Sequence, residues 1–212
     1  LYYLSNQAGE VNLSELSKSL EVKAPTANSM VKRLSEKGRV EYRRYQPLLL
    51  TELGKMDAAL IIRRHRLAEM YLAEKMGFGW EEVHAIAEQM EHLQCPEFFD
   101  RMDELLGFPK IDPHGSPIPR KDGSVPHRPL RKLFECRVGE RLRLEGLAHS
   151  SEDFLQYLNQ RQITLGQEMT ILSKEPFDGS MMICYPGHQQ ETFSKTVCQN
   201  LLVEELEEAS KS

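Results

Sequence analysis

The chain has 212 residues, of which 40% are hydrophobic and 28% are charged, with a formal net charge of −5. This length suits one large domain or two to three small ones, and the apolar content excludes a wholly disordered chain. No apolar run approaches the ~20 residues that cross a bilayer, and the first ten residues lack the features of a signal peptide. Four scattered cysteines without a CxxC pair favour reduced thiols. We therefore expect a cytoplasmic protein with no membrane partner.

The charge is unevenly distributed along the chain. Residues 1–75 carry 13 Lys and Arg against 9 Asp and Glu, a net of +4, whereas residues 76–212 carry 14 against 23, a net of −9. A basic front half favours a polyanionic partner, although an ordinary solvated surface is the alternative.

The basic front of the chain predicts a winged helix-turn-helix. The first residues resemble the end of an amphipathic helix whose earlier part is not included. A short amphipathic helix is expected over 13–20, and Pro25 opens a second helix that Gly38 ends. Two β-rich arms, Val40–Arg43 and Leu48–Thr51, follow and are joined by a short turn. Two helices with a tight turn and then a hairpin are typical of this motif.

In this interpretation the second helix enters the major groove of DNA. Its start is small and polar, so the backbone can approach DNA closely. Candidates for contacts with bases or phosphates share this helix or the hairpin tip, where a wing would meet the DNA backbone or minor groove. They are Thr26, Asn28, Ser29, Lys32 and Arg33 on the helix, and Arg43 and Arg44 at the tip. The alternative for each is a solvated surface position.

The middle of the chain is helical in pattern. We expect a long helix over 52–76, a second over 80–94 and a third from about 95 to 107. Apolar stripes on these helices favour a paired state of the chain. Residues 107–129 contain six prolines, which exclude a regular helix or a central strand and predict a linker or irregular extension.

The last part of the chain changes to β-like runs with glycine-bearing turns. We expect a small β-barrel of the SH3 type over 130–207. Its expected elements are strands at Arg141–Leu147, Gln167–Ser173 and Met181–Tyr185, and a helix at Glu152–Asn159.

Potential metal ligands gather on the two central helices. His84, Glu88, Glu91 and His92 fall within roughly a 100° arc of one helical face. Glu88 and Glu91 would repel each other unless a cation lies between them. His65 and Glu69 are four residues apart on the preceding helix. Together the two helices could build a site for one or two divalent metals, although a single histidine on a helix is usually a surface or core residue.

The ligand types narrow the choice of metal. Imidazole and carboxylate without thiolate favour Mn(II), Fe(II), Co(II), Ni(II) or Zn(II) over Cu(I), and the carboxylates weight the site towards Mn(II) and Fe(II). Structural zinc is disfavoured because no Cys/His quartet has finger spacing. Cys95 is expected to be a cap or a packed thiol. The four remaining histidines, His114, His127, His149 and His188, lie in expected loops, and we expect them to bind nothing.

The string RHRLAE…VHAIAEQMEHLQCPE over 64–97, followed by PHGSPIP over 113–119, resembles the diphtheria toxin repressor and manganese transport regulator family. This resemblance covers nearly the whole chain and implies a dimeric, metal-dependent repressor that binds double-stranded operator DNA. It implies a mostly α fold with small β parts. The implied domains are a winged helix-turn-helix at 1–57, a helical dimerisation and metal domain at 58–108, a Pro-rich linker at 109–129 and an SH3-like domain, similar to the ferrous-transport-associated fold, at 130–207.

The resemblance also assigns residues. His65, Glu69 and His84 match the family's ancillary metal site, and Glu88, Glu91 and His92 match its primary site. Iron-type members have Cys where Glu88 stands and manganese-type members have Glu, which favours Mn(II), with Fe(II) as the alternative. Family members draw a further primary-site ligand from a helix upstream of Leu1. Some complete the ancillary site from the SH3-like domain, near Glu152 and Asp153 here. On the DNA side, Lys23, Pro25, Thr26, Asn28 and Ser29 match positions around the family's recognition-helix start.

The resulting hypothesis is a metal-gated repressor that controls metal homeostasis genes and is not an enzyme. Metal binding would tie the ligand helices to the DNA-binding domain and narrow its range of orientations. One alternative is a metalloenzyme with a His/carboxylate di-metal site, which would need an open coordination position and a substrate pocket. Another is a metal-independent winged-helix regulator whose SH3-like domain binds a peptide.

Overall fold

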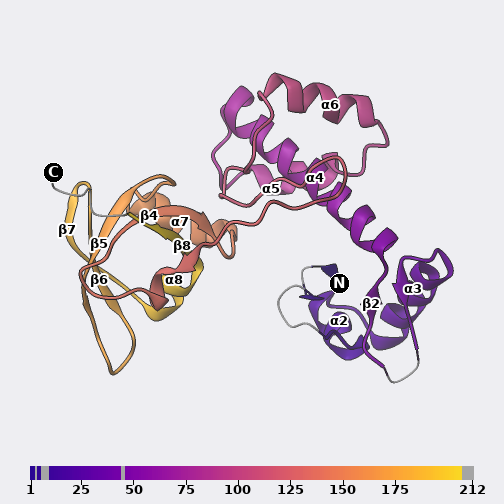
Figure 1. The fold of residues 1–212 in the computed structure, drawn as a ribbon, viewed down its shortest axis with the longest axis horizontal. Helices are drawn as coiled ribbons and strands as arrows, with labels where there is room; N and C mark the ends of the chain where they lie inside the picture. Colours follow the sequence, from indigo (N-terminus) through magenta and orange to yellow (C-terminus); the bar gives the residue numbers. More distant parts are fainter. Residues whose placement is uncertain (3, 6–9, 44–45, 207–212) are drawn as a thin grey trace. The chain divides into compact units, whose positions relative to one another are not determined.

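A computed structural model describes residues 1–2, 4–5, 10–43 and 46–206 (Figure 1). The chain forms two compact units. The first comprises Leu1–Arg63 and Pro119–Val125, and the second comprises Arg64–Ile118 with the chain from Pro126 onward. No helix among the described residues is long and apolar enough to pass through a membrane.

The first unit contains two short helices and a two-stranded antiparallel sheet. These are α2 (Leu13–Ser19), α3 (Ala24–Glu36), β1 (Val40–Glu41) and β2 (Leu49–Leu50). The predicted helices are confirmed to within a residue or two, whereas both strands are shorter than expected. The side chains of Val11, Leu16, Val31, Val40 and Leu48 form a small core between these elements.

A capping box explains where α2 begins, and a proline explains where α3 begins. Asn12 caps α2, because its Oδ1 accepts from the backbone NH of Glu15 at 2.9 Å and Glu15 Oε2 accepts from the Asn12 NH at 3.0 Å. Pro25 lies in the first turn of α3, where its missing NH leaves no bond unmade.

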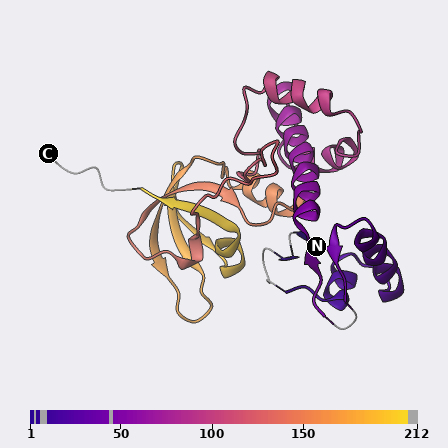
Figure 2. The same ribbon diagram turned by 45° about the vertical axis from the view of Figure 1, so that its right-hand side comes forward.

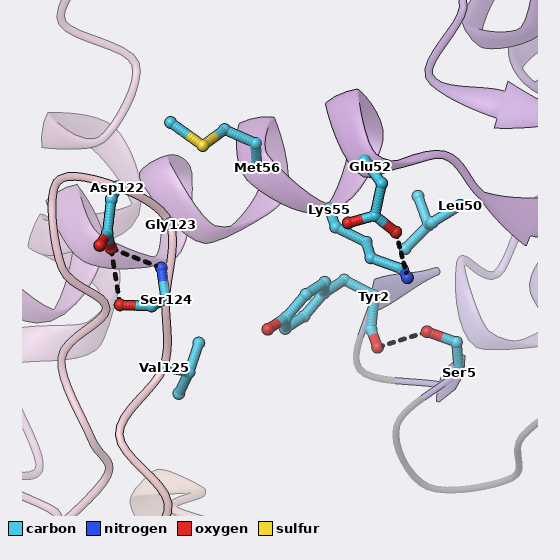
Figure 3. A pocket seen from close by; sticks show the side chains of 10 residues that line it. All are labelled: Tyr2, Ser5, Leu50, Glu52, Lys55, Met56, Asp122, Gly123, Ser124 and Val125. Atoms are coloured by element: carbon cyan, nitrogen blue, oxygen red, sulfur yellow. Dashed lines mark hydrogen bonds and ion pairs between the residues drawn. The ribbon is translucent and has the colours of Figure 1, made fainter.

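The long helix α4 (Glu52–Met76) begins directly after β2 and has the predicted bounds. The 119–125 segment packs beside its first half, and Arg63 donates to the Pro119 carbonyl at 2.8 Å. A cavity lies between this segment, the start of α4 and the N-terminal Tyr2 and Ser5 (Figure 3). Its charged groups are paired locally: Lys55 with Glu52 at 2.7 Å, and Asp122 with Ser124.

The helical part of the second unit packs α4 against α5 (Val83–Met90) and α6 (Pro96–Leu105). Its core consists of Leu67, Ala68, Leu72, Val83, Ala87, Phe99, Met102 and Ile118. The sequence-based helix over 80–94 was wrong at both ends. The residues at 80–82 form a turn, because the side chain of Glu82 bonds the Gly79 NH at 2.8 Å rather than extending the helix. The helix ends at Met90, with Glu91 as its C-cap.

The Pro-rich residues 107–129 contain neither helix nor strand, as expected, yet part of this segment packs tightly. Residues 110–118 form a closed turn, in which the Ile118 NH donates to the Lys110 carbonyl at 2.9 Å. Gly115 has a φ of +83°, and a Cβ there would collide with the Glu145 carbonyl, so glycine allows the turn to lie against the neighbouring strand. The turn is therefore part of the second unit's structure.

The remainder of the second unit contains an antiparallel sheet, drawn mostly in orange and yellow in Figure 2. Its strand order is β3-β8-β4-β5-β6-β7. Buried and exposed residues alternate in its strands, which places a mostly apolar core on one face. The predicted strands are confirmed, but β3, β7, β8 and α8 were not predicted. The elements are β3 (Arg131–Lys132), the 3-10 turn η1 (Leu133–Glu135), β4 (Arg141–Leu147), α7 (Glu152–Gln160), β5 (Glu168–Lys174), β6 (Met181–Tyr185), β7 (His188–Phe193), α8 (Lys195–Asn200) and β8 (Leu201–Glu205).

Candidate metal centre and nucleic-acid interface

Three potential ligands meet between α4 and α5. His65 and Glu69 are one turn apart on α4, and His84 lies in the first turn of α5. The Nε2 of His65 lies 3.0 Å from Glu69 Oε1, and the Nδ1 of His84 lies 3.2 Å from the same oxygen. The two ring nitrogens are 3.1 Å apart. This compact triangle fits adjacent ligands of one divalent ion, whose bonds are about 2.0–2.2 Å long.

The electrostatics of this group depend on Glu69, whose side chain is only 3% exposed. Burial alone would raise its pKa, but hydrogen bonds with His65 and His84 and the charges of His65 and His114 lower the pKa to about 2. Burial alone would lower the pKa of His65, but the hydrogen bonds and charges of Glu69 and Glu91 raise it. The hydrogen bond with Glu69 also raises the pKa of His84. The buried carboxylate thus requires positive charge beside it, which either protons or a divalent cation can supply.

A second group meets the other oxygen of Glu69. His114 is buried, and its Nδ1 lies 3.8 Å from Glu69 Oε2. Its Nε2 donates to the Trp80 carbonyl at 2.8 Å, which leaves Nδ1 as the nitrogen that faces the carboxylate. Asp112 is also buried, and one ligand atom from each of Glu69, Asp112 and His114 lies within 4.8 Å of the others. Glu69 therefore belongs to two possible ligand groups, one at each oxygen.

The 110–118 turn holds Asp112 in place. Its Oδ1 accepts from the backbone NH groups of His114 at 2.8 Å and Ser116 at 2.9 Å, and Arg66 Nε lies 3.4 Å from Oδ2. Burial, followed by the charge of Glu69, raises the pKa of Asp112. A cation near both carboxylates would relieve this repulsion.

The three residues matched to the primary site are not gathered in this structure. Glu91 Oε2 lies 2.8 Å from His65 Nδ1, so this carboxylate is turned towards the first group. His92 is exposed, with its Nε2 4.0 Å from Glu91 Oε1. Glu88 is exposed on α5, and its charge contributes to the raised pKa of His84. Their assignment as ligands stays a prediction.

The two candidates on α7 lie at the start of that helix, and both are exposed. Glu152 lines a cleft with His84 and His149, and Glu81 and Glu82 complete its acidic wall. Asp153 is not among the residues that line this cleft. The geometry thus brings Glu152, rather than Asp153, into one cleft with His84.

Most of the predicted DNA-contacting side chains are exposed at the start and along the outer face of α3. Asn28 is half-buried, because its Oδ1 accepts from the hydroxyl of Tyr42 at 2.8 Å. The Ser29 hydroxyl donates to the Pro25 carbonyl at 3.0 Å. Arg44 lies outside the described residues. The exposed candidates are Lys23, Pro25, Thr26, Ser29, Lys32, Arg33 and Arg43.

Sequence reasoning missed Asp112 and His114, which lie in the segment interpreted as a linker. The available signal was the string DPHGS, in which two ligand-type side chains flank a proline and precede a glycine. Such a string predicts a turn, but no local pattern indicates which distant helix the turn packs against.

Comparisons with known proteins identify all three parts of the chain. The metal binding and dimerisation domain of iron dependent repressors matches residues 51–120, their N-terminal DNA binding domain matches residues 1–48, and the FeoA domain matches residues 131–205. A solved manganese-dependent transcriptional repressor in complex with manganese is 32% identical, with a TM-score of 0.85, over 92% of this chain and 91% of that chain. Solved ScaR with bound Zn²⁺ is 26% identical, with a TM-score of 0.81, over 97% of each chain.

A further relative, compared by sequence, is similar to this chain over nearly its whole length. The iron-dependent repressor IdeR of Mycobacterium leprae (strain TN) is 26% identical over 97% of this chain and 94% of that protein. The resemblance inferred from residues 64–97 is therefore confirmed, as is the fold class with a DNA-binding, a helical metal-binding and an SH3-like part. The chain belongs to the iron-dependent repressor family of metal-dependent transcriptional regulators.

Proposed function

We propose that this chain is a Mn(II)-responsive repressor, with Fe(II) as the alternative effector, that acts in the cytoplasm and is not an enzyme. One observation carries the proposal: the buried carboxylate of Glu69 meets His65 and His84 at one oxygen and faces His114 at the other. A bound divalent cation would supply the positive charge that this carboxylate requires. Nitrogen and oxygen ligands without thiolate suit Mn(II). Glu88 also favours Mn(II), because manganese-type members of the family have Glu at this position and iron-type members have Cys.

The proposed ligands form two sets. His65, Glu69 and His84 would hold one ion, with Glu152 or Asp153 supplying an acidic group from α7, and with Asp112 and His114 at the second oxygen of Glu69. Glu88, Glu91 and His92 would hold the other. Glu91 contacts His65 in this structure, so it would have to leave that contact to serve the second ion. The first set is the better supported, because its ligand atoms already meet.

The proposed response is a coupling between these ligands and α3. The helix α4 supplies residues to both units, since its first half belongs to the DNA-binding unit and its second half carries His65 and Glu69. Metal and operator affinities must rise by the same factor, because thermodynamic coupling is reciprocal. A coupling of about 1–3 kcal/mol corresponds to roughly 5- to 150-fold regulation.

We further propose that the chain binds double-stranded operator DNA as a homodimer. Two recognition helices about 34 Å apart would meet successive major grooves. The proposed contacts are those of Lys23, Pro25, Thr26, Asn28, Ser29, Lys32, Arg33, Arg43 and Arg44. The proposed domains are 1–57 for DNA binding, 58–108 for dimerisation and metal binding, 109–129 as a linker, and 130–207 as the SH3-like FeoA domain.

The test is an anaerobic titration of operator affinity with Mn²⁺, Fe²⁺ and Zn²⁺ on the full chain. Glu69→Gln keeps the shape of the side chain but removes its charge, so we expect it to lose about tenfold or more of the Mn²⁺ activation. Glu74→Gln is the matched control, because Glu74 lies on the same helix, is half-exposed and pairs only loosely with Lys75 at 3.9 Å. Full Mn²⁺ activation of Glu69→Gln, or a flat response of the wild type, would contradict the proposal.

A further inference from the structure

One of the proposed DNA-contacting side chains, that of Asn28, is held in one orientation by a hydrogen bond from another element. Asn28 lies on the first turns of α3 and is half-buried, whereas its neighbours Thr26 and Ser29 are exposed. The hydroxyl of Tyr42 donates to Asn28 Oδ1 at 2.8 Å. Tyr42 directly follows β1 and therefore belongs to the wing rather than to the recognition helix.

The ring of Tyr42 is itself held in place. It packs against the small core of the first unit, which includes Val31 of α3 and Val40 of β1. The packed ring therefore fixes the position of the Tyr42 hydroxyl. The Asn28 amide has to rotate into the orientation in which its Oδ1 meets that hydroxyl. This contact lies entirely within the first unit.

The hydrogen bond changes the balance between the donors and the acceptor that the Asn28 amide offers to DNA. An unrestrained asparagine reads adenine with two bonds: its carbonyl oxygen accepts from N6 and its NH₂ group donates to N7. Here the Tyr42 hydroxyl takes one of the two lone pairs of Oδ1 and fixes the amide plane, so that this oxygen keeps only one lone pair in a fixed direction. Among the described wing residues none bonds to the two Nδ2 hydrogens, so both of these donors remain for DNA. Donors of this kind match acceptors, which in the major groove are guanine O6 and N7 and thymine O4.

We propose that Tyr42 is a specificity-determining positioning residue that presents Asn28 to DNA as a hydrogen-bond donor. At the base pair nearest Asn28, the repressor then favours an acceptor edge and disfavours the paired adenine contact. This inference rests on the proposed function, since it requires that α3 binds operator DNA.

If Tyr42 only stabilises the fold, a different result is expected. In that case removal of the hydroxyl lowers stability and weakens binding to all operators equally. Tyr42→Phe separates the two roles, because it keeps the packed ring and removes only the donor.

The experiment is a selection from operators with randomised half-sites, using the Mn²⁺-saturated full chain and its variants. For Tyr42→Phe we expect one position in each half-site to shift towards adenine, with roughly a tenfold change in relative affinity there. The salt dependence of binding should stay unchanged, because no phosphate contact is lost. Tyr71→Phe is the matched control: Tyr71 packs against the helical core of the second unit.

A second variant tests whether the effect passes through Asn28. In the Asn28→Ala background, the further change Tyr42→Phe should alter no base preference, since the amide is gone. An unchanged preference in Tyr42→Phe, or a shift that persists without the Asn28 amide, overturns the inference alone. A wild-type chain that selects no operator with Mn²⁺ overturns the proposed function as well.

Discussion

At the scale of single residues, Glu69 is the most deeply buried of the three candidate ligands His65, Glu69 and His84. It is buried, it lies beside two imidazoles at one oxygen, and it faces a third at the other. A buried anion of this kind is costly unless it is paired. The site therefore has two alternative partners for the same charge, protons on the histidines or a divalent ion, and they compete.

This competition predicts opposite pH dependences for the metal-free and the metal-saturated chain. The pKa values of His65 and His84 are raised, so their contribution to metal-free stability is full below 6.5 and is lost as pH rises through the raised values. The pKa of Glu69 falls from 4.5 to about 2, so its contribution is present above 4.5 and is lost as pH falls towards 2. We expect the metal-free chain to lose stability as the pH rises from 6 to 9.

Urea unfolding at a series of pH values measures this effect. With saturating Mn²⁺ the trend should reverse, because imidazoles bind metal only when deprotonated. In metal-free Glu69→Gln the dependence should flatten, since the histidines lose their main partner. An equal pH slope in this variant and the wild type would show that other groups dominate.

How much of the site can be predicted from the sequence depends on how local each contact is. The spacing of His65 and Glu69 follows from one helical turn, and the approach of His84 follows from the packing of two amphipathic helices. His92 was placed on the same face by extending the helix past Met90, where the chain actually turns. Asp112 and His114 reach Glu69 only through long-range packing of the 110–118 turn, which no periodicity encodes.

At the scale of elements, the cap of α2 contributes to the stability of the DNA-binding unit. Asn12→Ala removes the acceptor for the Glu15 NH and frees the Glu15 side chain from its reciprocal bond. We expect a loss of about 1 kcal/mol, measured by thermal or urea unfolding. Asn12→Asp keeps a capping oxygen and should lose much less. Equal losses in both variants would mean that the cap is not the cause.

Gly54, in the first turn of α4, is a helix position where alanine should be less favourable than glycine. Gly to Ala within a helix normally stabilises by up to about 1 kcal/mol. At Gly54, however, a Cβ would overlap the Arg39 carbonyl and press on the Leu50 side chain. We therefore expect Gly54→Ala to destabilise the chain by about 2 kcal/mol, with a lower melting temperature in calorimetry. Lys55→Ala, one exposed position further, is the control, and a raised melting temperature of Gly54→Ala would contradict this account.

The elements differ in how well their sequence specifies them. The helix α4 has the predicted bounds because its 25 residues lack both Gly and Pro beyond the first turn. The strands β3 and β8 were missed because each pairs with a partner far along the chain, Arg131 with Val203 for example. Their short runs carry too little alternation to be recognised alone.

At the scale of the whole molecule, exposed apolar residues on and after α6 suit the proposed dimer. Phe98 is 41% exposed, Leu105 62% and Phe108 64%. We expect Leu105→Glu to shift the chain towards monomer in sedimentation and to weaken operator binding about tenfold or more. Phe177→Glu is the control, since Phe177 is 97% exposed on the β5–β6 turn. A dimeric Leu105→Glu variant would place the interface elsewhere.

Trp80 gives the protein a built-in optical probe. It is the chain's single tryptophan, its indole NH donates to Asn159 at 2.7 Å, and its ring lies 6.1 Å from that of His114. Tryptophan emission, as distinct from that of the seven tyrosines, therefore originates from one indole beside the Glu69 cluster. Paramagnetic Mn²⁺ held there would quench its emission far more than diamagnetic Zn²⁺, so the filling of the cluster can be followed in solution without a label.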